Sequence, residues 1–262
     1  MDYRQIFSLT GKKALVAGAS RGIGLAIAQA AATHGARTVL AARSLDALER
    51  EAEALGEQGC EVEIVRLDIT DDSSIDSCAH AHGDADILIN VAGTNIRKRF
   101  QDYSAQEYER IMQTNLHGVV RLTQKVGARM VERGRGGKIV NIGSLMSLLG
   151  LPYLSVYAMT KSALAGLTRV LAAEWGEHNI QVNCIAPGFI LTDLNREMWQ
   201  PEVMKEWLKG VQPNPRLGTP ADIAGLAVFL SSPASDYITG QVIAADGGYT
   251  TTAKWPFGPA QS

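Results

Sequence analysis

Short apolar runs alternate with helical stretches along almost the whole chain, and this alternation constrains the fold more than any other feature. Strands are expected at 12–17, 38–42, 62–67, 86–91, 138–142, 180–185 and 241–245. Helices are expected over 23–30, 44–55, 72–82, 104–133 and 157–177, and from 219 onward. Strict alternation predicts a doubly wound α/β fold, in which a parallel sheet of about seven strands carries helices on both faces. With 262 residues, we expect one domain over 1–262.

Capping residues mark where several of these helices begin. Ser44 precedes an amphipathic stretch and fits an N-cap position, where a side-chain oxygen accepts a backbone N–H. Ser104 and Glu107 have the spacing of a capping box, and Thr219 with Asp222 makes a similar start around a proline. Helix starts are therefore expected at these positions.

Two regions interrupt the alternation. Residues 189–216 form a long connection that contains Trp199, Trp207 and several prolines. Beside a ligand crevice such a segment is often a lid over the substrate, whereas elsewhere it is an ordinary surface insertion. The tail 250–262 carries Trp255 and Phe257, which either pack on a neighbouring subunit or belong to a frayed end. Both alternatives stay open for each region.

The composition excludes several classes of partner and site. The 25 basic and 27 acidic residues give a net charge of −2, so nothing indicates binding to nucleic acid or to an anionic membrane. The three cysteines include no C-x-x-C pair, so neither a disulfide framework nor a metal site is predicted. Residues 1–13 lack the apolar core of a signal peptide, and no apolar run reaches the ~18 residues of a membrane span. We expect a cytoplasmic protein that acts on a small molecule.

A glycine-rich turn follows the first expected strand. Its sequence GASRGIG places Gly18, Gly22 and Gly24 between that strand and the next helix. Residues without a Cβ allow a tight turn whose backbone amides, together with the helix N-terminus, approach a pyrophosphate. The spacing differs from the more familiar G-x-G-x-x-G, but its place at the start of an alternating chain indicates a dinucleotide site.

The end of the second expected strand bears on which dinucleotide binds. NAD-binding proteins usually place an acidic residue there for the ribose 2′-hydroxyl, but this chain has Ala42 and Arg43. Arg43 and Arg21 could both hold a 2′-phosphate, because guanidinium groups pair well with phosphate. We therefore expect NADP(H), the alternative being that both arginines are simply solvated.

Ser144, Tyr157 and Lys161 form the candidate catalytic group. Tyr157 and Lys161 are four residues apart and share one face of a helix. An ammonium group near a phenol favours the phenolate and lowers the pKa of the tyrosine. Such a tyrosine can exchange a proton with a ketone or an alcohol, while a serine hydroxyl holds the same oxygen. The Tyr157–Lys161 pair alone would suit any surface helix, but the glycine turn upstream favours catalysis.

Together these motifs resemble the short-chain dehydrogenase/reductase family, from Leu9 to Tyr249. Two positions depart from the family pattern: Ala17 stands where threonine is common, and Val91 replaces an asparagine. These changes affect fine positioning rather than the proton-transfer groups. The matching motifs are GASRGIG (18–24), Asp68 in LDIT, NVAG (90–93), Asn115 in QTNLHG, the Ser144/Tyr157/Lys161 trio and PGFILT (187–192).

The resemblance implies a Rossmann-type fold, a mechanism and a set of binding residues. Tyr157 exchanges the proton, Ser144 holds the carbonyl oxygen, and Lys161 lowers the pKa of Tyr157 and binds the nicotinamide ribose. Asn115 holds a water that relays protons from Lys161, and Thr192 touches the nicotinamide amide. The cofactor-binding residues implied are Gly18, Ser20, Arg21, Gly22, Ile23, Gly24, Arg43, Asp68, Ile69, Asn90, Ala92, Gly93, Tyr157, Lys161, Pro187, Gly188, Ile190 and Thr192.

A basic cluster after the fourth expected strand bears on the substrate. Arg97 is the best candidate to pair with a substrate carboxylate, and Lys98 and Arg99 are weaker ones. The stretches SLMSLLG, AEWGEHNIQVNCIAPGF and LTDLNREM resemble the gluconate 5-dehydrogenase branch of the family, which acts on sugar acids. We therefore expect a sugar acid or polyol, with Ser144, Tyr157 and Arg97 as substrate-binding residues. Asn195 and Arg216 are further candidates for contacts with sugar hydroxyls.

Two other functions stay open. A 3-oxoacyl-thioester reductase would use the same chemistry on an acyl carrier, which needs a basic docking patch. A protein that senses NADPH without turnover would not need the complete catalytic trio. The residues that could form the docking patch are Arg129, Arg133, Arg135 and Lys138.

The helices on either side of 138–142 carry apolar residues on more than one face, so we expect a homotetramer, as in many members of the family. A dimer or a thicker monomer core would explain the same pattern. The residues concerned are Leu116, Val119, Val120 and Leu122 in one helix and Leu164, Leu167, Val170 and Leu171 in the other.

Overall fold

A single parallel sheet of seven strands forms the centre of the computed structural model, which describes residues 3, 5–193 and 195–251. The strand order is β3-β2-β1-β4-β5-β6-β7, so the chain changes direction across the sheet between β1 and β4. This fold is the predicted one, and no strand end differs from its expected position by more than two residues. The strands are β1 (Lys13–Ala17), β2 (Arg37–Ala42), β3 (Val62–Arg66), β4 (Ile87–Asn90), β5 (Gly137–Ile142), β6 (Ile180–Pro187) and β7 (Val242–Ala245).

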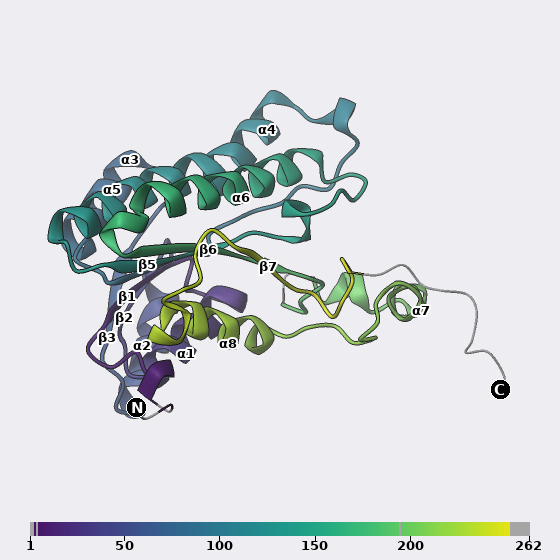
Figure 1. Ribbon diagram of the computed structural model, residues 1–262. Helices are drawn as coiled ribbons and strands as arrows, with labels where there is room; N and C mark the ends of the chain where they lie inside the picture. The colour runs from purple at the N-terminus through teal and green to yellow at the C-terminus, as the bar shows by residue number, and fades with distance from the viewer. Residues whose placement is uncertain (1–2, 4, 194, 252–262) are drawn as a thin grey trace.

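Helices cover both faces of the sheet (Figure 1). One face carries α1 (Gly22–Thr33), α2 (Leu45–Glu57) and α8 (Pro220–Ser231). The other face carries α3 (Asp72–His82), α4 (Ala105–Met112), α5 (Gly118–Arg133) and α6 (Ser155–Trp175). The remaining helix, α7 (Glu202–Val211), lies beyond the ends of the strands, within the segment predicted as a lid. None of the helices described is long and apolar enough to cross a membrane.

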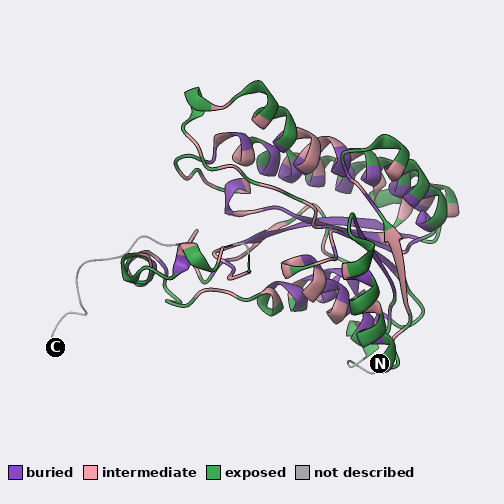
Figure 2. Ribbon diagram, turned by 180° about the vertical axis from the view of Figure 1, so that it is seen from behind, coloured by how far each residue is buried: buried purple, intermediate pink, exposed green. Residues whose placement is uncertain are grey.

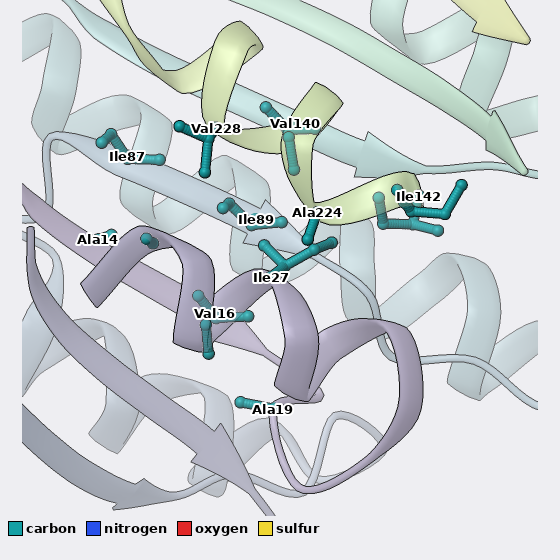
Figure 3. Close-up of a cluster of buried hydrophobic side chains, with 14 of the residues drawn as sticks. Ala14, Val16, Ala19, Ile27, Ile87, Ile89, Val140, Ile142, Ala224 and Val228 are labelled. Carbon is teal, nitrogen blue, oxygen red and sulfur yellow. The ribbon is translucent and has the colours of Figure 1, made fainter. Parts of the chain in front are cut away.

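Side-chain alternation along the strands supplies two apolar cores. Ala14 and Val16 of β1 pack under α1 and α8, whereas Leu15 of the same strand packs under α3, α5 and α6. Figure 3 shows the first core, where Ile27 of α1 and Val228 of α8 lie over the strands. Because both faces are covered, the strands are mostly apolar, and Figure 2 shows the sheet as the buried centre of the molecule.

The helix starts follow the predicted caps. The Ser104 hydroxyl accepts the Glu107 N–H at 3.2 Å, and the Glu107 carboxylate accepts the Ser104 N–H at 2.8 Å. At the start of α8 the Asp222 carboxylate accepts both the Thr219 N–H at 2.7 Å and the Thr219 hydroxyl at 2.9 Å. Ser44 precedes α2 as predicted, but its side chain makes no capping hydrogen bond. The helix predicted over 104–133, however, is interrupted by one π-helical turn at Gln113–His117, which separates α4 from α5. The apolar periodicity gave no sign of this turn.

Two further expectations concern the cysteines and the tail. Cys60, Cys78 and Cys184 are free thiols, with Cys78 and Cys184 buried. Trp255 and Phe257 lie outside the described residues.

Candidate active site

The glycine turn connects β1 to α1 at the carboxyl edge of the sheet, where ligands of doubly wound folds bind. Gly18 and Gly22 have left-handed backbones, with φ of +101° and +56°. A Cβ on Gly24 would lie 2.0 Å from the Gly18 carbonyl oxygen, so only glycine allows this close approach. The turn leaves the first N–H groups of α1 without helical partners, which fits a pyrophosphate. Ser20 and Arg21 lie within the turn, and Ile23 packs against the core beneath it.

The ends of β2 and β3 form a basic corner beside this turn. Ala42 of β2 pairs in register with Arg66 of β3, and the exposed Arg43 follows directly. Asp68 faces this corner: hydrogen bonds from Thr70 lower the pKa of its carboxyl group, and the charges of Arg43 and Arg66 lower it further. Ile69 is buried beside it. Arg66 was missed from the sequence, although its place at a strand end next to Ala42 was a usable signal.

Ser144, Tyr157 and Lys161 come together at the ends of β5 and the start of α6. The Lys161 ammonium lies 5.6 Å from the centre of the Tyr157 ring and donates to the Ile142 carbonyl at 2.7 Å. Ser144 follows β5, and its hydroxyl lies near enough to the Tyr157 phenol to lower the pKa of that phenol. The Ser147 hydroxyl donates to the Lys161 carbonyl at 2.9 Å and ties the Ser144 turn to α6.

The pKa of Tyr157 does not follow the sequence expectation. Desolvation raises the pKa of the phenol above 10.0, and the hydrogen bond with Ser144 lowers it by less. Lys161 itself is 3% exposed, and desolvation lowers its pKa to about 8. In the protein without cofactor the amine is therefore easily neutralised and the phenol keeps its proton. The expected lowering of the Tyr157 pKa by Lys161 is absent in this state.

Asn115 lies in the π-helical turn, fully buried. Its carbonyl oxygen accepts the Thr94 N–H at 2.7 Å, and its amide donates to the Thr94 carbonyl at 2.8 Å. A Cβ placed on Gly93 would lie 3.6 Å from both the Asn115 oxygen and the Lys161 nitrogen. The turn therefore brings Asn115, Gly93 and Lys161 to one point behind the catalytic tyrosine.

Several residues that we expected to bind the cofactor have side chains that pack or hydrogen-bond inside the core instead. Asn90 is 2% exposed and donates to Thr123 and Asn141, both at 2.9 Å, so its amide lies inside the core. Ile190 is 6% exposed, and its side chain also packs in the core. These positions, and Ala92, can face a cofactor only through their backbones.

The segment after β6 returns toward the glycine turn. A Cβ on Gly188, next to Pro187, would lie 2.6 Å from the Asp246 Cα, which explains the small residue. Thr192 lies against the glycine turn, because a Cβ on Gly22 would be 3.6 Å from its methyl group. Asn195 accepts the Thr192 N–H and donates to the Ile190 carbonyl, both at 2.8 Å. One N–H and one lone pair of its amide are thus used within the loop, and a contact of Asn195 with sugar hydroxyls stays a prediction.

The basic cluster divides into different roles. The Lys98 ammonium contacts both carboxylate oxygens of Glu107 at 2.9 Å, and its N–H donates to the Tyr153 carbonyl at 2.9 Å. Lys98 is therefore structural, whereas Arg97 and Arg99 are exposed. Arg97 has no ion-pair partner among the residues that the structure describes. Arg216 makes two hydrogen bonds with Asp222, at 2.7 and 2.8 Å, which support the start of α8, and its contact with a substrate stays a prediction.

Comparison with known proteins agrees with this geometry. A family model described as Enoyl-(Acyl carrier protein) reductase matches residues 18–250. The chain is 39% identical over 256 residues to gluconate 5-dehydrogenase of Gluconobacter oxydans, covering 96% of this chain and 100% of that protein. It is 37% identical over 245 residues to a 3-oxoacyl-[acyl-carrier-protein] reductase of Chlamydia muridarum, covering 92% and 98%. The crystal structure of a gluconate 5-dehydrogenase from Burkholderia cenocepacia, in complex with NADP and tartrate, has a TM-score of 0.91 at 33% identity, covering 95% of this chain and 99% of that one.

The chain belongs to the short-chain dehydrogenase/reductase family. Within the family it lies in the gluconate 5-dehydrogenase-like branch, and it is an oxidoreductase that acts on CH–OH groups. The arrangement of Ser144, Tyr157 and Lys161 suits that chemistry, because a hydroxyl and a protonated phenol converge where a carbonyl oxygen could bind.

This short-chain dehydrogenase/reductase also has an aromatic wall that sequence reasoning did not find. It consists of Phe189, Trp199, Trp207 and Tyr249. The Phe189 ring lies 5.4 Å from the Trp199 and Trp207 rings and 5.0 Å from the Tyr249 ring, in edge-on contacts. Three of the four residues lie in the segment 189–216 and the fourth follows β7, so no local pattern could have revealed that they pack together.

Proposed function

We propose that the protein is an NADP(H)-dependent oxidoreductase that interconverts a ketone and a secondary alcohol on a sugar acid, as a gluconate 5-dehydrogenase does. The observation that carries the proposal is the Tyr157 phenol, held between the Ser144 hydroxyl and Lys161 beside the glycine turn. Support comes from the similarity to gluconate 5-dehydrogenases, one of which binds NADP and tartrate.

In the proposed reduction, Tyr157 donates its proton to the carbonyl oxygen while Ser144 hydrogen-bonds the same oxygen. Bound NADPH supplies the hydride that the carbonyl carbon gains, and NADP⁺ accepts it in the reverse direction. The ammonium of Lys161 stabilises the phenolate left on Tyr157, because opposite charges favour one another most where water is excluded. Asn115 holds Gly93 and Thr94 in place, and the family resemblance adds a water relay from Lys161 to solvent.

The residues fit a dinucleotide with a 2′-phosphate. The pyrophosphate would lie on the turn 18–24, and the basic corner of Arg43 and Arg66, with Arg21 nearby, would hold the 2′-phosphate. No acidic residue follows β2, where NAD-binding proteins usually have one. Further relatives of known structure contain NADP. These observations favour NADP(H) over NAD(H).

The proposed substrate carries a carboxylate, with Arg97 as its partner. Arg97 follows β4 on the segment that Lys98 and Glu107 fix in place, and its guanidinium group is exposed. An exposed arginine that has no ion-pair partner among the described residues is suited to bidentate binding of a carboxylate. Asn95, exposed on the same segment, adds an amide on this side.

An NADPH oxidation assay tests the proposal. We expect turnover of 5-ketogluconate and none of acetoacetyl thioester, and we expect Tyr157→Phe to lower kcat by about 10²-fold or more while NADPH still binds. Turnover of the thioester alone would support the carrier-dependent reductase instead. Tight NADPH binding without turnover of any ketone would support a sensor.

The thioester alternative has less support from the surface. A docking patch for an acyl carrier needs free cations, but Arg129 donates to the His80 carbonyl and Lys138 pairs with Asp236 at 2.7 Å. Arg133 donates to the Asp84 and Ala85 carbonyls. Of the four candidates, Arg135 alone has no such bond among the described residues.

We also propose that the enzyme is a cytoplasmic homotetramer. Free thiols suit a reducing compartment. Met159 and Val170 of α6 are 47% and 53% exposed, although both are apolar residues on a long helix. Burial against a second copy would remove this surface from water.

A further inference from the structure

The catalytic tyrosine borders an apolar region on the side of the lid. Leu145, Met146 and Leu154 form a small buried cluster just after Ser144. Tyr157 packs against this cluster, and so do Phe189 and Tyr249 of the aromatic wall. Trp207 extends the wall from α7 and is 37% exposed. A substrate held by Tyr157 therefore has apolar carbon and ring faces on this side.

Two polar side chains of the lid make hydrogen bonds within the lid. The Asn195 amide is bound at both ends to backbone groups between Ile190 and Thr192. The Gln212 amide donates to the Asn214 and Arg216 carbonyls. A substrate hydroxyl on this side would find ring faces, with the indole N–H of Trp207 and the phenol of Tyr249 as the polar atoms left on the wall.

The opposite side of Tyr157 is polar and basic. The segment between β4 and α4 carries exposed Asn95, Arg97 and Arg99, and it is joined to the α6 side by the Lys98–Tyr153 hydrogen bond. In Figure 1 this segment runs from the sheet to α4, on the side of α4–α6, whereas α7 lies on the side of α8. The site thus has a cationic end and an apolar end, with the proton-transfer group between them.

From this polarity we infer that the substrate is a keto acid whose end remote from the carboxylate carries no hydroxyl group, such as a terminal deoxy sugar acid. The inference rests on the proposed function and specifies its substrate further. A carboxylate toward Arg97 leaves the other end of the chain against the aromatic wall. A methyl group is favoured there, because the wall offers a terminal hydroxyl mostly ring faces, with only the Trp207 indole N–H and the Tyr249 phenol as hydrogen-bonding partners.

Two substrates that differ by one oxygen atom test the inference: 5-ketogluconate and its 6-deoxy analogue, in which the terminal CH₂OH is CH₃. We expect kcat/KM with NADPH to be roughly 10- to 100-fold higher for the 6-deoxy compound, the range by which an apolar pocket rejects an added hydroxyl. Initial rates at several substrate concentrations give both values.

Variants of the wall show whether it causes the preference. Phe189→Asn places an amide where the hydroxyl would lie, and we expect it to reduce the preference at least about fivefold, since a new hydrogen bond compensates the hydroxyl. Trp207→Gln makes the same test at a partly exposed position in case Phe189→Asn does not fold. Val203→Asn, 70% exposed on α7, is the matched control and should keep the wild-type ratio.

Each outcome decides the matter. Equal or better turnover of 5-ketogluconate overturns the inference and leaves the proposed function standing. A 6-deoxy preference that survives both wall variants overturns it as well, because another part of the site then sets the preference. No turnover of either compound by the wild-type protein removes the proposed function and the inference with it.

Discussion

At the scale of single residues, the site contains a lysine whose burial costs stability. Desolvation lowers the Lys161 pKa from 10.5 to about 8, so the unfolded chain holds this proton more tightly than the native protein does. Below pH 8, Lys161 is protonated in both the native and the unfolded protein, and the native protein bears the full desolvation cost of the buried ammonium. Above pH 8 the native state loses the proton first, and stability rises with pH.

Lys161→Met should therefore flatten the pH dependence of unfolding in the protein without cofactor. We expect the wild-type free energy of unfolding to gain more between pH 7 and 9 than that of the variant, by on the order of 1 kcal/mol. Urea titrations at pH 7, 8 and 9 measure the difference. If the free energies of unfolding of the two proteins changed with pH in parallel, burial would not lower the pKa of Lys161.

Gly24 illustrates a different residue-scale constraint. A Cβ there would lie 2.0 Å from the Gly18 carbonyl, so Gly24→Ala must open the turn that faces the pyrophosphate. We expect NADPH to bind at least about tenfold more weakly, since the turn supplies its backbone donors. The control is Gly56→Ala in α2, where a Cβ meets nothing within 4 Å and should stabilise the helix by about 0.5–1 kcal/mol. Fluorescence titration with NADPH compares them, and equal affinities would contradict the assignment of the turn.

The basic corner makes a third residue-scale prediction. Arg43→Ala and Arg66→Ala should each lower the affinity for NADPH by about tenfold and leave the affinity for NADH nearly unchanged. The reason is that a charge-assisted hydrogen bond to phosphate contributes on the order of 1.5–3 kcal/mol. Arg50→Ala, exposed on α2, is the control. Equal losses for both cofactors would mean that neither arginine reads the 2′-phosphate.

At the scale of elements, Lys98 and Glu107 connect two loops around the site. Glu107 caps α4 and also holds the Lys98 ammonium, while the Lys98 backbone holds Tyr153, whose φ of +69° is unusual for a large side chain. The hydrogen bonds from Lys98 and Ser104 lower the Glu107 pKa to about 2. The connection therefore persists well below neutral pH, and it is lost only as the pH falls toward that value.

Removing the Lys98–Glu107 ion pair should weaken substrate binding more than cofactor binding. We expect Lys98→Met to raise KM for the ketone by roughly 5- to 10-fold, since it frees the segment that carries Arg97, with NADPH affinity nearly unchanged. Glu107→Gln should give a similar KM, and the double variant should be no worse than either single one. Lys125→Met, which removes an exposed pair with Asp76, is the control. An unchanged KM in Lys98→Met would exclude this positioning role.

The helices and strands also show which parts of the structure could be predicted from the sequence. Apolar runs and caps such as Ser104–Glu107 predicted the sheet and the helix starts, because burial and capping depend on nearby residue types. The π-helical turn at Asn115 was not predictable in this way, since it depends on the contact with Thr94 across the fold. For the same reason motif spacing placed Tyr157 and Lys161, whereas the hydrogen-bond partners of Asn195 and Arg216 could not be predicted, because loop geometry determines them.

At the scale of the whole molecule, α6 presents an apolar stripe to solvent. Met159 and Val170 are exposed, and Ala163 and Gly166 between them recur at helical spacing, with open space above Gly166. Small residues between two apolar ones allow another helix to approach closely. By contrast, Val119 and Leu122 of α5 are buried within the chain, so the apolar pattern predicted for that helix is explained by its own core.

Val170→Arg should consequently break one set of subunit contacts. We expect the wild-type protein to sediment as a tetramer and the variant as a dimer, because a charge on a symmetric helix interface meets its own copy across the twofold axis. Val203→Arg, 70% exposed on α7, introduces the same charge away from α6 and should remain tetrameric. Sedimentation velocity at several concentrations distinguishes these states. A monomeric wild-type protein, or a Val170→Arg protein that keeps the wild-type mass, would show that the α6 stripe is not an interface.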